Sequence, residues 1–160
     1  MSYVQNIVKN VADYAGQLFN DLKEHADWVV ANREGLGDFS ACLLLLQLLI
    51  RARQLYEDIV YFLTMLMLTG AVRATARIYM VESDKELIEA LADQGLVHPD
   101  RAENAKTVLE TEAQKIYDRW TVYTSEFTNA VNDVKNLRDE ALAHILNRYT
   151  EVGCSGVLSV

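Results

Sequence analysis

The stretch LETEAQKIYDRWTVYTSEFTNAVNDVKNLRDEA, residues 109–141, decides the fold of this 160-residue chain. Apolar residues recur in it at alternating spacings of four and three, which is the period of a helix that packs along one seam. The seam positions are Leu109, Ala113, Ile116, Trp120, Tyr123, Phe127, Ala130, Val134, Leu137 and Ala141. After a stutter the stripe continues through Ile145, Tyr149 and Val152. No glycine or proline occurs in residues 100–152, so the pattern predicts one helix over this range.

Another long helix is predicted at the N-terminal end, over residues 2–33. Its apolar stripe has the same period and consists of Val4, Ile7, Val11, Tyr14, Leu18, Leu22, Ala26 and Val29. The segment EGLGD, residues 34–38, is expected to end this helix. Gly35 is predicted to adopt the left-handed conformation of a C-cap, and Asp38 to cap the helix that follows.

The middle of the chain, ACLLLLQLLIRARQLYEDIVYFLTMLMLTGAV over residues 41–72, is apolar except for four charges near its centre. We predict a helix over 39–81. On a wheel of about 100° per residue its polar stripe is interrupted by Phe62 and Met65. A helix of this kind either occupies the centre of a bundle or packs against another subunit. Arg53 and Glu57 are four residues apart and are expected to form an ion pair.

The sequence Ser83-Asp84-Lys85-Glu86 has the pattern of a capping box and predicts a short helix over 84–94. Gly95 is expected to end this helix, and Pro99 suits the first turn of the last one. The chain is therefore predicted to be a single all-α domain over 1–160, an elongated helical bundle with coiled-coil-like packing. Residues 153–160 are expected to form a flexible or partner-docked tail.

The net charge of −8 argues against non-specific binding to nucleic acid or to anionic membranes. Cys42 and Cys154 lack metal-ligand spacing, which predicts neither a disulfide framework nor a zinc site, and favours a reducing compartment. The N-terminal residues do not resemble a signal peptide. The uncharged apolar runs, 39–50 and 59–72, are shorter than the roughly 20 residues of a membrane span. A location in the cytoplasm or within an assembled particle is expected.

Candidate chemical sites are few. Glu140 with His144, and Glu24 with His25, resemble part of the Glu-x-x-His pattern of di-iron bundles, but their spacing differs from it and matching carboxylates are not evident. We therefore expect no metal and no other cofactor. Cys42 lies in an apolar helix without an adjacent base, and no glycine-rich phosphate loop occurs. The sequence favours a protein that is not an enzyme, and it indicates no small-molecule substrate.

The predicted helices of about 30, 40 and 50 residues differ in length, which leaves part of the 100–152 seam without an intramolecular partner. This mismatch favours a non-enzymatic structural protein that assembles with copies of itself, as a filament, shell or virion coat subunit or as a coiled-coil scaffold. The residues expected at the oligomer interface are Phe62, Met65, Trp120, Tyr123, Phe127, Leu137, Ile145, Tyr149 and Leu158.

Three other hypotheses are open. A membrane-active or lipid-binding bundle would expose residues 39–72, but the charges at Arg51, Arg53, Glu57 and Asp58 disfavour insertion. A ferritin-like metal-binding bundle is less favoured. Arg51, Arg73 and Arg77 share one face of the 39–81 helix and are a possible polyanion contact, which would bind nucleic acid only within an assembly.

Overall fold

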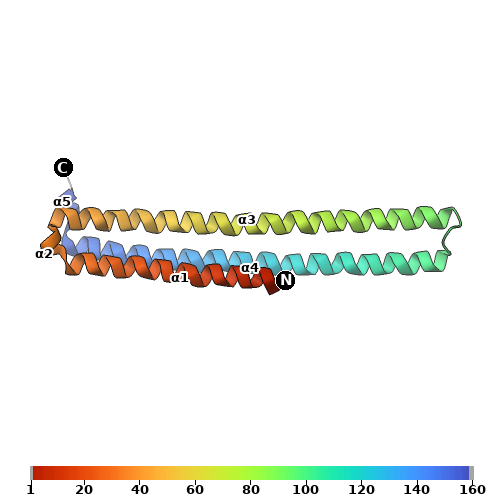
Figure 1. The fold of residues 1–160 in the computed structure, drawn as a ribbon, viewed down its shortest axis with the longest axis horizontal. Coiled ribbons are helices and arrows are strands. Elements are labelled where there is room, and N and C mark those ends of the chain that lie inside the picture. Colours follow the sequence, from red (N-terminus) through yellow and green to blue (C-terminus); the bar gives the residue numbers. More distant parts are fainter. Residues whose placement is uncertain (1, 159–160) are drawn as a thin grey trace. The chain divides into compact units, whose positions relative to one another are not determined.

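The computed structural model describes the backbone of residues 2–158 and the side chains of residues 6–158. In this range the chain forms α1 (Ser2–Ala31), α2 (Arg33–Leu36), α3 (Asp38–Asp93), α4 (Pro99–Val152) and α5 (Cys154–Leu158), which Figure 1 labels. No strand occurs among these residues, so the predicted all-α fold is confirmed. The Val4 side chain and residues 159–160 of the predicted tail lie outside the described residues.

The chain divides into two compact units, which we describe separately. The bundle unit comprises residues 2–63 and 128–158 and therefore contains α1, α2 and α5 with one segment each of α3 and α4. The hairpin unit comprises residues 64–127 and contains the other segments of α3 and α4. This division is finer than the single domain expected over 1–160.

The core of the bundle unit forms where α1, α3, α4 and α5 meet. Its buried residues are Ala26, Val29, Ala41, Cys42, Leu45, Leu48, Ile145 and Cys154. Small side chains at positions 26 and 41 allow close packing of the helices, and the leucines of α3 fill the space between them. The predicted α1 stripe is correct for Ala26 and Val29. Tyr14, however, is exposed, because the N-terminal half of α1 turns Val8, Ala15 and Phe19 inward instead.

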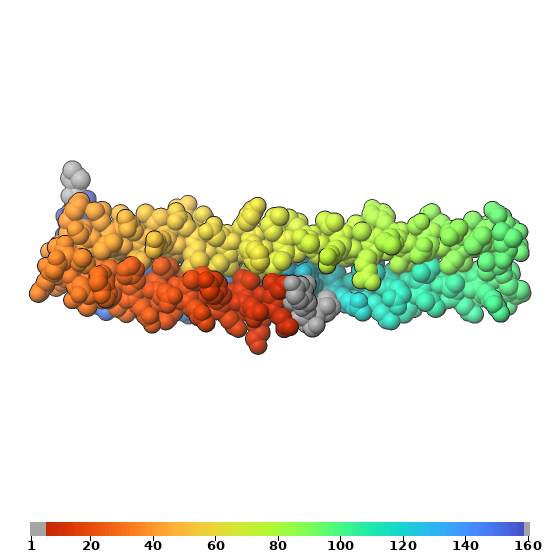
Figure 2. All heavy atoms as spheres, viewed as in Figure 1, coloured from red at the N-terminus to blue at the C-terminus, as the bar shows by residue number. Residues whose placement is uncertain are grey.

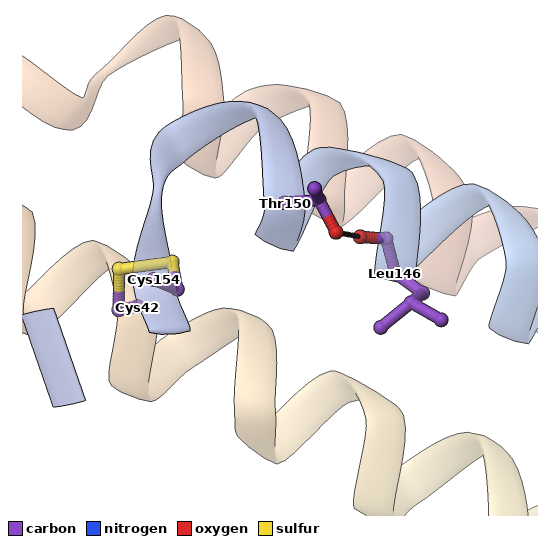
Figure 3. Close-up of a disulfide and its surroundings, with 4 residues drawn as sticks. All are labelled: Cys42, Leu146, Thr150 and Cys154. Carbon is purple, nitrogen blue, oxygen red and sulfur yellow. Dashed lines mark hydrogen bonds between the residues drawn. A yellow bond between two sulfur atoms is a disulfide. The ribbon is translucent and has the colours of Figure 1, made fainter. Parts of the chain in front are cut away.

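The C-terminal segment differs from the flexible or partner-docked tail that the sequence suggested. Cys154 begins α5 and forms a disulfide with Cys42 of α3, with the two Cα atoms 5.4 Å apart (Figure 3). Both cysteines are fully buried, and Val157 and Leu158 pack against the core of the bundle unit. The expectation of no disulfide is therefore wrong, because the fold brings together two cysteines that are 112 residues apart.

Glycines with positive φ angles mark the helix ends. Gly37, and not Gly35, has the left-handed φ of 84° between α2 and α3, and Asp38 is the first residue of α3. Gly95 has a φ of 73°, and the following N–H of Leu96 donates to the Leu91 carbonyl at 2.9 Å, which closes the end of α3. Pro99 is the first residue of α4, as predicted.

The predicted break between residues 81 and 84 is wrong, because α3 continues without interruption from Asp38 to Asp93. No glycine or proline occurs in residues 71–94 to end the helix, and Val81, two residues before the predicted cap Ser83, is buried. A Ser-x-x-Glu pattern caps a helix only where the preceding turn is not already helical. The predicted pair of Arg53 with Glu57 is confirmed at 3.2 Å, although both side chains are exposed.

In the hairpin unit the α3 and α4 segments run antiparallel and pack along the predicted α4 seam. Ile116, Tyr123 and Phe127 are buried there, and the seam residues Leu109, Ala113 and Trp120 are half-buried. Ion pairs join the two helices further along, from Lys85 Nζ to Glu110 Oε1 at 3.3 Å and from Lys106 Nζ to Glu89 Oε1 at 3.1 Å. These contacts fix the register of the hairpin.

Candidate functional site

The outward face of α3 in the hairpin unit is apolar and exposed. It consists of Met65, Leu68, Val72 and Tyr79, of which Val72 is 69% and Tyr79 is 72% exposed. On a wheel of about 100° per residue these side chains lie opposite Gly70 and Val81, which face α4. Figure 2 shows α3 of this unit, in yellow to green, at the surface of the unit. One face of α3 is thus covered by α4, and the other is an unpartnered apolar surface in the described chain.

The α3 segment of the bundle unit has a second exposed apolar face. Phe39, Leu43, Leu46 and Ile50 are exposed there, although Ala41, Leu45 and Leu48 of the same helix are buried in the core.

The most apolar 18-residue stretch of α3 has only 6% of its residues buried, and by length and composition alone α3 could cross a membrane.

An eleven-residue spacing relates these exposed residues in the sequence. Phe39, Ile50, Tyr61 and Val72 are each eleven positions apart, as are Leu46, Glu57, Leu68 and Tyr79. Eleven residues correspond to about three helical turns, so such residues recur on one face of a helix. This spacing is the sequence signal that could have found Leu68, Val72 and Tyr79. The polar stripe of the predicted 39–81 helix does not point to these three residues.

The outward face of α4 in the hairpin unit is mostly polar, although Val108, Tyr117 and Val122 of this helix are also exposed. The hydroxyls of Thr107, Thr111 and Thr121 each donate to the backbone carbonyl four residues earlier, at 3.0, 2.9 and 3.0 Å. Gln114 Nε2 donates to Asp118 Oδ1 at 2.9 Å on the same helix. The exposed apolar residues of α3 therefore form one row, whereas those of α4 fall on different sides of that helix.

The predicted oligomer-interface residues have different surroundings. Phe62 and Met65 are exposed, whereas Trp120, Leu137, Tyr149 and Leu158 are half-buried within the chain. Tyr123, Phe127 and Ile145 are buried within the chain itself, and their place at an oligomer interface stays a prediction. In the hairpin unit α3 covers Tyr123 and Phe127, and in the bundle unit Ile145 belongs to the core that α5 also contacts.

The three arginines of the predicted polyanion contact are all exposed, but they belong to different units. Arg51 lies in the bundle unit, and Arg73 and Arg77 lie in the hairpin unit. Burial raises the pKa of Tyr123, and the positive charge of Arg73 partly opposes this shift. Contact of these arginines with nucleic acid stays a prediction.

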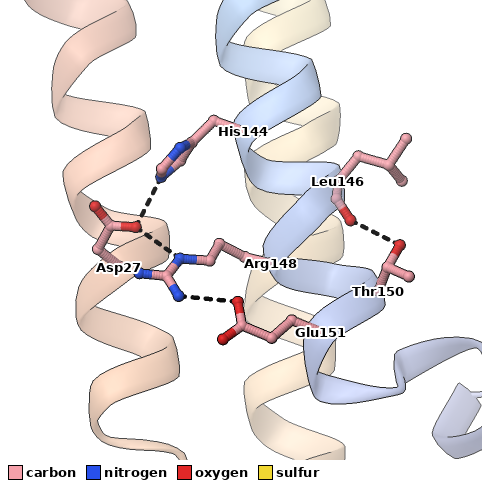
Figure 4. Close-up of polar contacts among 6 residues, drawn as sticks. All are labelled: Asp27, His144, Leu146, Arg148, Thr150 and Glu151. Atoms are coloured by element: carbon pink, nitrogen blue, oxygen red, sulfur yellow. Dashed lines mark hydrogen bonds and ion pairs between the residues drawn. The ribbon is translucent and has the colours of Figure 1, made fainter.

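A polar cluster joins α1 to α4 in the bundle unit (Figure 4). Asp27 Oδ1 lies 2.7 Å from His144 Nε2 and accepts a hydrogen bond from Arg148 Nε at 2.9 Å. Arg148 Nη1 also donates to Glu151 Oε2 at 2.9 Å. Burial raises the pKa of the Asp27 carboxyl, but the hydrogen bonds and charges of Arg148 and His144 outweigh it, so the pKa is lowered.

In this cluster His144, one of the two histidines in the predicted metal pairs, connects α4 to Asp27 of α1. Glu24 accepts a hydrogen bond from Asn20, and His25 lies against Trp28 with ring centroids 6.0 Å apart. Residues 2–158 contain no group of three or more His, Cys, Asp or Glu side chains that could hold a metal ion. The geometry of the described residues therefore gives the ferritin-like hypothesis no support.

Comparison with known proteins finds no family model, no curated protein and no solved structure that matches this chain.

Proposed function

We propose that this chain is a non-enzymatic structural subunit that assembles with copies of itself through the outward face of α3. The observation that carries the proposal is the row Met65, Leu68, Val72 and Tyr79, which is apolar and exposed opposite the face covered by α4. Large contiguous apolar patches on soluble proteins mark interaction surfaces, since leaving them in water is unfavourable.

A filament, a shell or virion coat, and a coiled-coil scaffold are the forms of assembly that we propose. The buried disulfide of Cys42 with Cys154 favours an oxidising environment, such as the exterior of a particle, over a reducing cytoplasm. In this proposal the disulfide stabilises the bundle unit, and the outward face of α3 makes the intersubunit contact.

Light scattering behind a sizing column, with negative-stain microscopy of the same fractions, tests the proposal. The wild-type chain is expected to show masses that are multiples of 18.1 kDa and rise with concentration. Tyr79→Glu places a charge on the outward face of α3 and is expected to shift the mass toward the monomer. Tyr117→Glu is the matched control, because Tyr117 is 51% exposed on α4 of the same unit.

Two results would contradict self-assembly through α3. One is an 18.1 kDa monomer at every concentration. The other is an equal loss of mass for Tyr79→Glu and Tyr117→Glu, which would indicate that the effect is not specific to α3.

Binding to lipid is the second candidate function, and the exposed apolar length of α3 favours it. Burying Arg51 or Asp58 in hydrocarbon would cost about 2.5–3.5 kcal/mol each, which opposes full insertion. Flotation with neutral phosphatidylcholine vesicles separates the two candidates. Protein that floats with the vesicles, and loses this property in Tyr79→Glu, supports lipid binding. Protein that stays at the bottom of the gradient contradicts lipid binding, and its mass in solution then tests assembly.

A further inference from the structure

The two flanks of the hairpin unit differ in how their charged side chains are arranged. One flank, which we call the acidic flank, contains Glu82, Glu89 and Glu110. The ion pairs Lys85–Glu110 and Lys106–Glu89 show that this side of α3 and this side of α4 lie together. Glu82 is on the same flank, since its Oε1 lies 3.8 Å from Lys85 Nζ.

The other flank contains exposed arginines from both helices, and we call it the arginine flank. On a wheel of about 100° per residue, Arg73 and Arg77 of α3 and Arg119 of α4 lie on the sides opposite the two cross-helix ion pairs. The register of those pairs, Lys85 with Glu110 and Glu89 with Lys106, places Arg119 level with the turn between Arg73 and Arg77. The three guanidinium groups therefore gather within about two turns of the hairpin.

The carboxylates of the arginine flank lie toward its two ends. Asp84 and Glu112 are level with each other beyond Arg77, and Glu112 Oε1 is paired with Lys115 Nζ at 3.3 Å. Glu126 lies on the other side of Arg73. The centre of this flank is thus positively charged, although the chain as a whole has a net charge of −8.

The chain also has a surface of matching chemistry on α1 of the bundle unit. Asp13, Asp21 and Glu24 are exposed on the face of α1 opposite its buried residues, together with Tyr14 and Trp28. On the helical wheel the two lysines of α1 fall closer to the core than these carboxylates do. The outward face of α1 is therefore acidic and partly aromatic.

We propose that the outward face of α1 of one copy docks along the arginine flank of the hairpin unit of a second copy. Asp21 and Glu24, about 4.5 Å apart along the helix axis, then face the three guanidinium groups, and Trp28, about one turn further along α1, can stack on an arginine side chain. This inference rests on the proposed self-assembly and adds a second, electrostatic contact to the apolar contact of α3.

The predicted contact joins two different surfaces, so it is heterologous. Each copy contributes one acidic face and one arginine flank, and repetition of such a contact produces an open filament or a closed ring. Because the contact is made by exposed charges, it weakens as salt shortens the screening length from about 10 Å at 0.1 M to about 3 Å at 1 M.

Complementary charge reversal tests the contact in the full-length protein. Arg73→Glu with Arg77→Glu gives a chain with two acidic surfaces, and Asp21→Lys with Glu24→Lys gives a chain with two basic ones. Each variant alone is expected to lose large assemblies in sedimentation velocity at low salt, with an association constant lowered about tenfold or more. An equimolar mixture is expected to recover them, because each variant then finds a complementary surface.

The double variant Arg33→Glu with Arg51→Glu is the matched control. It changes the net charge by the same amount as Arg73→Glu with Arg77→Glu, but both positions are exposed and belong to the bundle unit, which does not contain the arginine flank. It is expected to assemble like the wild type. Far-UV circular dichroism of every variant verifies that the helices are retained.

Several outcomes would overturn the inference. Wild-type masses for both charge variants, or no recovery in the mixture, would exclude this contact while leaving assembly through α3 intact if Tyr79→Glu still reduces the mass. Loss of nucleic-acid binding in Arg73→Glu with Arg77→Glu, with unchanged mass, would assign the arginine flank to a polyanion instead. A wild-type monomer at all concentrations would overturn both proposals.

Discussion

In the hairpin unit, Gly70 of α3 lies directly against aromatic side chains of α4. A Cβ atom at this position would lie 2.7 Å from Tyr123 Cε1 and 3.2 Å from Trp120 Cζ3. The Tyr123 ring contacts Phe127 edge-on at a centroid distance of 4.7 Å and Trp120 at 5.7 Å, so it cannot move aside without disturbing both neighbours. The aromatic packing in this unit therefore depends on the missing side chain of one residue.

Gly70→Ala is expected to lower the free energy of unfolding by about 1 kcal/mol. Overpacking costs about 1–3 kcal/mol, and the better helix propensity of alanine offsets about 1 kcal/mol. Urea denaturation followed by circular dichroism measures the change. Gly16→Ala is the matched control in α1, where no atom beyond the local helix backbone lies within 4 Å of the new Cβ, so it should stabilise by about 0.5–1 kcal/mol. Equal stabilisation by the two substitutions would contradict the close packing at Gly70.

The protonation state of the Asp27 carboxyl affects the stability of the bundle unit. The pKa of the Asp27 carboxyl is lowered from the ordinary value of 3.8. The ionised side chain therefore stabilises the folded state above pH 3.8, and this stabilisation is lost as the pH falls through the lowered pKa. Asp27→Asn is expected to cost only about 0.5 kcal/mol near neutral pH, since the side chain is 44% exposed and solvent screens its charge.

The pH dependence checks this interpretation of Asp27. Stability measured between about pH 5 and pH 2 should fall more steeply for the wild type than for Asp27→Asn. Asp118→Asn is the control, because Asp118 is exposed on α4 and contacts Gln114 of the same helix. Identical pH profiles for the wild type and Asp27→Asn would show that the ionised Asp27 carboxyl does not contribute to the stability of the bundle unit.

Among the elements, α5 has only five residues and is held by its disulfide and by the core of the bundle unit. A helix of this length is not stable alone in water, because nucleation outweighs the few hydrogen bonds that it forms. The contacts of Cys154, Val157 and Leu158 with the core therefore decide its position. The same contacts shield the hydrophobic end of the bundle unit from water.

Replacing both cysteines by alanine is expected to lower the free energy of unfolding by about 2–4 kcal/mol. The disulfide closes a loop across 112 positions, and a loop of about 100 residues loses much conformational entropy in the unfolded chain. Guanidinium denaturation with and without a reductant measures the effect. The reductant should lower the midpoint of the wild type and leave the double variant unchanged. A wild-type midpoint that does not respond would exclude the disulfide.

At the scale of the whole molecule, the chain has many more large apolar side chains than its cores bury. In each unit the core covers one side of its α3 segment, while Leu43 and Ile50 in the bundle unit and Leu68 and Val72 in the hairpin unit are exposed. Exposed apolar surface of this extent has a free-energy cost of roughly 25 cal/mol per Å², which association with a partner removes. The central question for this protein is therefore its mass in solution.

Sequence periodicity was sufficient for α4. All thirteen predicted seam residues from Leu109 to Val152 are buried or half-buried, because a helix of known period can turn only one stripe toward its neighbours. Local chemistry also determined Gly95 at the end of α3, Pro99 at the start of α4 and the pairing of Arg53 with Glu57. These features depend on residues that are at most a few positions apart.

Tertiary structure decided the remainder. The sequence of α3 is apolar on two faces, so periodicity could not tell which face α4 covers and which is exposed. The disulfide between Cys42 and Cys154, the Asp27–Arg148 contact and the close approach at Gly70 each join residues more than fifty positions apart. Such contacts follow from how the helices pack against one another, and a one-dimensional pattern contains no information about that packing.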